Sequence, residues 1–155
     1  MRIAVLHGPN LNLLGRREPE VYGTATLADI DANLGRLAAE LGIEVETFQS
    51  NVEGDLIDYV HGAAAAVGGF VVNAGGYTHT SVALLDALSG VGRPYVEVHL
   101  SNLSAREPFR RTSLLAPRAI GIVMGFGAES YPLALRGLVQ ALRRSPAADV
   151  PRPTT

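Results

Sequence analysis

The stretch RIAVLHGPN, residues 2–10, decides the expected fold. Residues 3–6 are all apolar and Gly8-Pro9 ends the run, which is the pattern of a short buried strand followed by a turn. Further strand-like stretches occur at residues 43–48, 70–72, 95–98 and 119–123. Continuous apolar runs such as residues 3–6 and 70–72 are typical of a parallel sheet that is covered on both faces.

Segments with helical periodicity separate these strands. Apolar side chains recur every three or four residues from Leu27 to Leu41, with Thr26 as a suitable N-cap and Gly42 as a suitable C′ residue. The same spacing predicts helices over 56–67, ending at Gly68-Gly69, and over 81–88, capped by Thr80 or Ser81. A last helix is expected from Ser130 to Leu142, closed by Arg143-Arg144 at its negative dipole end.

Alternating strands and helices predict a flavodoxin-like, doubly wound parallel α/β sheet with right-handed crossovers and helices on both faces. A chain of 155 residues fits a single core. We expect one α/β domain over residues 1–144 and a flexible tail over 145–155, which is rich in Pro, Ala and Thr.

The composition excludes several classes of function. With no cysteine, disulfides, thiolate nucleophiles and Cys-zinc sites are excluded. All 13 basic side chains are arginine, so Schiff-base chemistry and a Walker-type phosphate loop are excluded as well. A net charge of -2 gives no reason to expect nucleic acid or an anionic membrane as partner. No apolar run is long enough to span a bilayer and residues 1–8 lack a signal-peptide layout, so a cytoplasmic location is expected.

Polar side chains follow the predicted strands, where the carboxyl ends of parallel strands meet at one edge of the sheet. They include two histidines, several arginines, amides and a tyrosine: Asn10, Arg17, Tyr22, Asn73, His79, His99, Ser101, Arg106 and Arg110. Their convergence predicts a site for a small polar anion.

Four of these segments also carry a family resemblance. Residues 8–23, 48–58, 73–88 and 97–113 resemble, in order, the signature regions of the type II 3-dehydroquinate dehydratases, and the likeness extends from about Ile3 to Arg144. The resemblance implies a hydro-lyase of the shikimate pathway that converts 3-dehydroquinate to 3-dehydroshikimate through an enolate, without metal or cofactor. It also implies trimers that gather into a homododecamer. His7 departs from the family, which commonly has asparagine there, and no role is assigned to it.

The base implied by the resemblance is Tyr22, with Arg17 as its activating cation. A free tyrosine has a pKa of about 10, and lowering it by ~2–3 requires ~3–4 kcal/mol of preference for the phenolate. One arginine at ~4 Å supplies ~4 kcal/mol at an effective dielectric of ~20, so a single well-placed cation is sufficient. The alternative is that Tyr22 is an ordinary surface tyrosine of a loop.

The acid implied by the resemblance is His99. Alternation along a strand puts Glu97 on the same face, where its carboxylate could orient or charge the imidazole. Asn10 resembles the family asparagine that holds a water near the developing oxyanion. The ordinary alternatives are a strand-end histidine satisfied by backbone and an asparagine used for a turn.

The remaining assignments concern the substrate. By resemblance, Asn73 and the backbone N–H groups of Leu100 and Ser101 hold its carboxylate, in the manner of an anion nest. His79, Asp86 and Arg110 resemble the residues that fix the ring hydroxyls, with Asp86 reaching in from a neighbouring subunit, and Arg106 matches an arginine of the mobile lid. The alternative is that the aspartate and the arginines are solvated surface charges.

Other classes of protein remain as rivals. A metal hydrolase could use Glu97, His99, His79 and Asp86, but no H-E-x-x-H or similarly compact spacing occurs. A nucleotide-binding module of flavodoxin type fits the architecture, but the first loop has no Ser/Thr-rich phosphate cradle and residues 121–127 do not match G-x-G-x-x-G. A response-regulator-like domain would need an acidic cluster after the first strand and a late lysine, and a serine hydrolase would need G-x-S-x-G; neither pattern is present.

Overall fold

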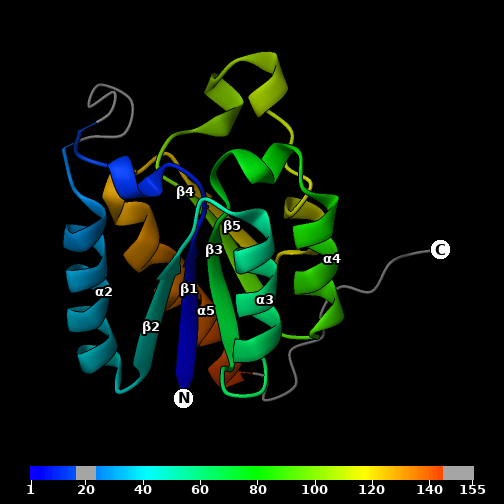
Figure 1. Ribbon diagram of the computed structural model, residues 1–155. Coiled ribbons are helices and arrows are strands. Elements are labelled where there is room, and N and C mark those ends of the chain that lie inside the picture. The colour runs from blue at the N-terminus through cyan, green and yellow to red at the C-terminus, as the bar shows by residue number, and fades with distance from the viewer. Residues whose placement is uncertain (17–23, 145–155) are drawn as a thin grey trace.

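Figure 1 shows the computed structural model, which describes residues 1–16 and 24–144. Its sheet has five parallel strands in the order β2-β1-β3-β4-β5. The strands are β1 (Arg2–His7), β2 (Glu44–Gln49), β3 (Gly69–Asn73), β4 (Tyr95–His99) and β5 (Gly121–Met124). The α-helices are α2 (Leu27–Leu41), α3 (Glu53–Ala63), α4 (Val82–Gly90) and α5 (Ser130–Arg144). The predicted doubly wound α/β architecture is therefore confirmed.

The helices form two layers, one on each face of the sheet (Figure 1). The α2/α5 face is packed through one cluster of buried side chains, which includes Leu34, Leu138 and Val5 of β1. The α3/α4 face is packed through a second cluster, in which Leu56 and Leu84 meet Leu6. Because both faces are buried, residues 3–6 of β1 and 70–72 of β3 are apolar on both faces, which is why the sequence shows continuous apolar runs there.

Strand alternation decides which polar side chains meet which helix layer. In β4, Val96 and Val98 belong to the cluster on the α2/α5 face. Glu97 and His99, which alternate with them, therefore turn toward the α3/α4 face. In β1 and β3 the polar residues lie on the other face. His7 is two positions after Val5, and Asn73 is two positions after Val71, so both point toward the α2/α5 face, as these valines do.

The switch in strand order lies between β1 and β3. The chain leaves β1 for β2 on one side and then returns to β3 on the other side. In an open α/β sheet the loops diverge at such a switch and leave a crevice at the carboxyl ends of the strands. These ends are followed by Gly8 and Ala74, and a Cβ on Gly8 would lie 2.4 Å from the carbonyl oxygen of Ala74. Only glycine therefore lets the two loops approach this closely.

The ends of α2 follow the predicted signals. The Thr26 side chain accepts a hydrogen bond from the backbone N–H of Asp29, and the Asp29 carboxylate accepts from that of Thr26, which completes a capping box. Gly42 has a φ of 65°, and the N–H of Ile43 then bonds to the carbonyl of Ala38. Because this bond belongs to the helix end, the second strand begins one residue later than the expected Ile43.

Three other boundaries differ from the sequence predictions. α3 ends at Ala63, not at Val67, because the N–H of Gly68 already bonds to Arg2 and draws the chain into the sheet. Ser81, not Thr80, caps α4 by accepting from the N–H of Leu84 at 2.9 Å. β5 begins at Gly121, because residues 116–118 form a 3-10 turn. Within residues 1–16 and 24–144, no helix is long and apolar enough to cross a membrane.

Candidate active site

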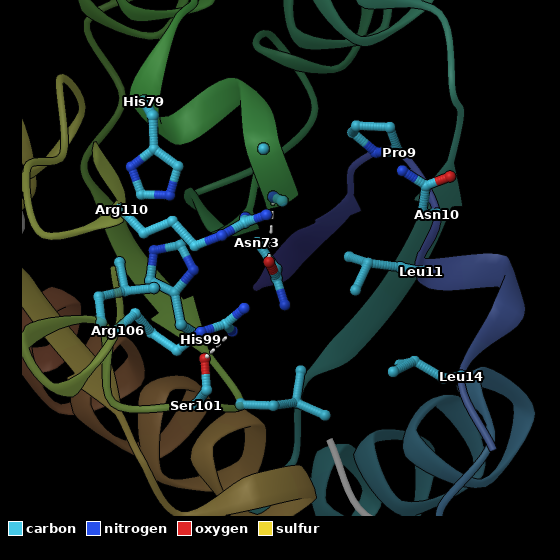
Figure 2. Close-up of a pocket in the computed structure, with 14 residues that line it drawn as sticks. Pro9, Asn10, Leu11, Leu14, Asn73, His79, His99, Ser101, Arg106 and Arg110 are labelled. Carbon is cyan, nitrogen blue, oxygen red and sulfur yellow. Dashed lines mark hydrogen bonds between the residues drawn. The ribbon is translucent and has the colours of Figure 1, made fainter. Parts of the chain in front are cut away.

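A pocket of about 180 Å³ lies at the carboxyl ends of β1, β3 and β4 (Figure 2). Eight of the predicted site residues line it: Asn10, Asn73, His79, His99, Leu100, Ser101, Arg106 and Arg110. Apolar side chains, including Leu11, Leu14 and Leu103, form part of its wall. The expected convergence of polar residues at the switch point is thus present.

The other predicted residues are placed differently. Glu97 is fully buried behind His99 and does not line the pocket. Asp86 is exposed on α4 and does not line it either. The predictions for Arg17 and Tyr22, like that for the tail over 145–155, lie outside the described residues.

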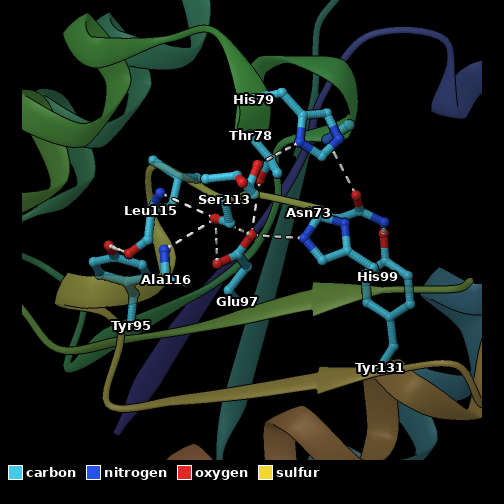
Figure 3. Close-up of polar contacts among 12 residues, drawn as sticks. Asn73, Thr78, His79, Tyr95, Glu97, His99, Ser113, Leu115, Ala116 and Tyr131 are labelled. Atoms are coloured by element: carbon cyan, nitrogen blue, oxygen red, sulfur yellow. Dashed lines mark hydrogen bonds and ion pairs between the residues drawn. The ribbon is translucent and has the colours of Figure 1, made fainter. Parts of the chain in front are cut away.

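The closest polar contact at the pocket joins His99 to Glu97. His99 Nε2 lies 2.6 Å from Glu97 Oε1, as strand alternation predicted, and both side chains are buried (Figure 3). A carboxylate can only accept, so Nε2 carries a proton and donates it to Glu97. The ring nitrogen that remains for the pocket is Nδ1.

Glu97 is held by two hydroxyl groups from separate loops (Figure 3). Thr78 donates to Oε1 at 2.8 Å, and Ser113 lies 2.8 Å and 2.9 Å from Oε1 and Oε2. Burial by itself raises the pKa of Glu97, but the hydrogen bond and charge of His99, followed by the two hydroxyls, outweigh burial and hold this pKa below its usual value. The result is a buried carboxylate that stays ionised beside His99.

Asn73 is buried at the end of β3 and also lines the pocket. Its Nδ2 donates to Tyr131 Oη at 3.0 Å, and its Oδ1 accepts from the N–H of Gly75 at 3.2 Å. One amide proton therefore remains for the pocket.

Asn10 has an unusual backbone. Its φ of 67° is the one positive value at a non-glycine position within the described ranges. Its N–H donates to Asn51 Oδ1 at 3.0 Å, and the same oxygen accepts from Gln49 Nε2 at 3.1 Å. Gln49 also donates to the carbonyl of Gly8 at 3.2 Å. The loop after β2 therefore holds the first loop in its left-handed conformation.

The far wall of the pocket is cationic. Arg106 donates to Ser101 Oγ at 3.1 Å, and Arg106 and Arg110 each place Nε 3.3 Å from a carboxylate oxygen of Glu107. His79 Nδ1 lies 2.7 Å from the carbonyl oxygen of Thr112, so Nδ1 carries a proton and donates it to this oxygen. Nε2 takes no part in this hydrogen bond. Arg106 and Arg110 bring two guanidinium groups to this wall, and guanidinium groups pair well with an anionic ligand.

Comparisons with known proteins identify the family of this chain. Residues 1–139 match the family model described as dehydroquinase class II. The chain belongs to the class II dehydroquinase family. Its curated relatives named 3-dehydroquinate dehydratase include one from Gemmatimonas aurantiaca, 60% identical over 92% of this chain and 93% of the relative, and one from Dinoroseobacter shibae, 56% identical over 99% and 100%.

Solved structures give the same result. The type II dehydroquinase from Butyrivibrio crossotus superposes with a TM-score of 0.88 at 40% identity, over 90% of this chain and 97% of that one. The type II dehydroquinase from Propionibacterium acnes gives 0.86 at 41%, over 90% and 96%. The expected family is confirmed, and the rival classes of flavodoxin module, response regulator and hydrolase are set aside.

Several side chains around this dehydroquinase site were missed by the sequence analysis. Thr78 and Ser113 hold Glu97, Asn51 holds Asn10, and Tyr131 holds Asn73. Their partners lie 19, 16, 41 and 58 positions away in the sequence. No local spacing rule connects residues so far apart.

Among residues 1–16 and 24–144, no three His, Cys, Asp or Glu side chains gather into a group that could hold a metal ion.

Proposed function

We propose that this dehydroquinase removes water from 3-dehydroquinate through an enolate, with Tyr22 as the base and His99 as the acid, in the shikimate pathway. The observation that carries the proposal is the buried Glu97 carboxylate, 2.6 Å from His99 Nε2, at the wall of a cationic pocket. A carboxylate so placed orients the ring, so that Nδ1 faces the pocket and can give a proton to the leaving group.

The first step takes a proton from the carbon beside the ketone. In the proposed mechanism Tyr22 is a phenolate stabilised by Arg17, and its oxygen accepts this proton while the electron pair moves onto the ketone oxygen. Asn10 would hold a water that donates to the resulting enolate oxygen. The left-handed backbone of Asn10, fixed by Asn51, supports a role that needs a defined position.

The second step expels the neighbouring hydroxyl. The enolate collapses to re-form the ketone, the carbon–oxygen bond breaks, and His99 Nδ1 gives its proton to the departing oxygen, which leaves as water. The steps use only side chains of the chain and one water, so neither metal nor cofactor takes part.

The polar pocket wall supports the proposed binding roles. Asn73, with one free amide proton, and the backbone N–H groups of Leu100 and Ser101 would hold the substrate carboxylate. His79 and Arg110 would fix the ring hydroxyls, and Arg106 would close over the site from the lid side.

The proposal also includes the assembly. Asp86 is exposed on α4, away from the pocket of its own chain. This position supports a role in a neighbouring subunit, within trimers that gather into a dodecamer. We further propose that residues 1–144 are one catalytic domain and that the enzyme works in the cytoplasm.

The direct test adds chelator-treated protein to 3-dehydroquinate and follows the ultraviolet absorbance of the conjugated enone product. We expect absorbance to rise for the wild type and for Tyr59→Phe, and not for Tyr22→Phe. Tyr59 is a matched control, because its hydroxyl bonds to Glu46 and it does not line the pocket. Normal turnover in Tyr22→Phe would refute the base, and loss of turnover on chelation would refute the metal-free mechanism.

A further inference from the structure

A chain of hydrogen bonds reaches the pocket from the α2/α5 face of the sheet. His7 Nε2 lies 3.0 Å from Asp31 Oδ1, and His7 Nδ1 lies 2.9 Å from Tyr131 Oη. Tyr131 Oη in turn accepts from Asn73 Nδ2 at 3.0 Å. We call Asp31, His7, Tyr131 and Asn73 the His7 relay. The proposed reaction uses only its last member.

The direction of each bond in the relay is determined by the backbone. The N–H of Gly75 donates to Asn73 Oδ1, which identifies the amide oxygen and leaves the amide nitrogen facing Tyr131. Tyr131 Oη therefore accepts from Asn73 and gives its own proton to His7 Nδ1. His7 then carries its proton on Nε2 and donates it to Asp31.

Burial disfavours any other set of hydrogen-bond directions in the His7 relay. His7 and Tyr131 are 0% exposed and Asn73 is 2% exposed. Burial raises the pKa of Tyr131, so its hydroxyl remains a neutral donor. Asp31, at the outer end of the relay, is also held in position, because Thr47 donates to its Oδ2 at 3.2 Å. A reversed bond anywhere would leave a buried donor or acceptor without a partner.

The inner end of the relay lies in the substrate pocket. β1 and β3 are neighbours, with His7 opposite Asn73, and both side chains turn toward α5, which supplies Tyr131. With Asn73 Oδ1 held by Gly75 and one amide proton held by Tyr131, the other amide proton is left for the pocket. We propose that His7 and Tyr131 are positioning residues that lock the Asn73 amide with its N–H, not its oxygen, toward the substrate carboxylate.

This inference rests on the proposed role of Asn73 in holding the carboxylate. Without an acceptor at position 7, the Tyr131 hydroxyl can donate to the amide oxygen of Asn73. The amide then turns over, and its oxygen repels the carboxylate of the substrate. Because the carboxylate does not react, binding weakens in the ground state and the transition state alike, which raises KM and leaves kcat unchanged.

The test compares His7→Leu with His7→Asn. The two replacements have nearly the same size and both lose the contact with Asp31. Asparagine places an oxygen near the former Nδ1 and can accept from Tyr131, whereas leucine cannot. We expect His7→Leu to raise KM about tenfold with kcat within about twofold of wild type, and His7→Asn to restore most of the affinity.

A second pair of variants shows whether the effect passes through Asn73. In an Asn73→Ala background, His7→Leu should produce no further rise in KM. If His7→Leu does not fold, as judged by its thermal unfolding, Tyr131→Phe tests the same link and should also raise KM about tenfold. An unchanged KM, equal effects of leucine and asparagine, or a further rise in the Asn73→Ala background would overturn the proposal.

The hydrogen-bond directions are tested without any turnover. The ¹⁵N chemical shifts of the His7 ring in the free protein should show a protonated Nε2 and a bare Nδ1 at neutral pH. A proton on Nδ1 instead would overturn the relay whatever the activity. If the wild type shows no turnover, the proposed function fails by itself, and the dissociation constant for 3-dehydroquinate replaces KM in the comparison of variants.

Discussion

Replacing Glu97 with glutamine should separate the charge of this residue from its shape. Among the described residues, Glu97 Oε1 accepts from His99, Thr78 and Ser113, while Oε2 accepts from Ser113. A glutamine with its oxygen at the Oε1 position can keep all three donors. Its NH₂ group would face Ser113 Oγ, which already accepts from two backbone N–H groups. Glu97→Gln therefore removes the negative charge and keeps the hydrogen bonds at Oε1.

The size of the effect follows from the bond to His99. A hydrogen bond to a charged partner contributes about 1–2 kcal/mol more than one to a neutral partner, and the proposed proton transfer from His99 loses about that much in the variant. This loss corresponds to a fall in kcat of about 5- to 30-fold.

The assay is the initial rate of enone formation at saturating 3-dehydroquinate and neutral pH for both proteins. Glu40→Gln serves as the control, because it removes one negative charge from an exposed position that pairs with Arg136 on the surface. An unchanged kcat in Glu97→Gln would refute the reasoning, as would a loss matched by Glu40→Gln.

The same variant should change the dependence of stability on pH. Since the folded pKa of Glu97 lies below the unfolded value of about 4.5, its ionisation stabilises the fold above that pH. This contribution is lost as the pH falls through the folded pKa. Denaturant unfolding of Glu97→Gln should therefore show a flatter fall in stability below about pH 4.5 than the wild type.

Four further outcomes are expected. Ser113→Ala removes a donor, raises the pKa of Glu97 and lowers kcat severalfold, as measured in the same assay. Asn10→Gly relieves the φ of 67° and raises the free energy of unfolding by about 0.5–1 kcal/mol, while turnover falls because the amide is lost. Thr26→Ala costs about 1 kcal/mol in urea unfolding through the lost cap, with kcat unchanged. Leu138→Ala, in the fully buried core, costs about 2–5 kcal/mol in the same measurement.

The site is assembled from both faces of the sheet. The proposed acid, His99, belongs to the α3/α4 face, where loop hydroxyls hold its carboxylate partner. The proposed carboxylate binder, Asn73, belongs to the α2/α5 face, where Tyr131 and His7 hold its amide. The two side chains meet at the carboxyl edge, and each is oriented by its own network.

The sequence determined the architecture, because that depends on local periodicity and on the short range of turn and capping signals. The run over 2–10, the spacing of leucines in 27–41 and the cap at Thr26 are all visible within a few residues. Alternation along the strand over 95–98 likewise predicted that Glu97 and His99 lie on one face. The four segments at 8–23, 48–58, 73–88 and 97–113 also led to the family.

Only the tertiary structure decided how the site residues are supported. Thr78, Ser113, Asn51 and Tyr131 are unremarkable in the sequence, and each acquires its partner when the sheet and its helix layers bring distant segments together. His7 is the clearest case. In the sequence it is a polar residue at the end of an apolar strand. Only packing against α5 and α2 brings Tyr131 and Asp31 to its two ring nitrogens. Hydrogen bonds between remote residues leave no periodic trace in a chain, because their geometry exists only after folding.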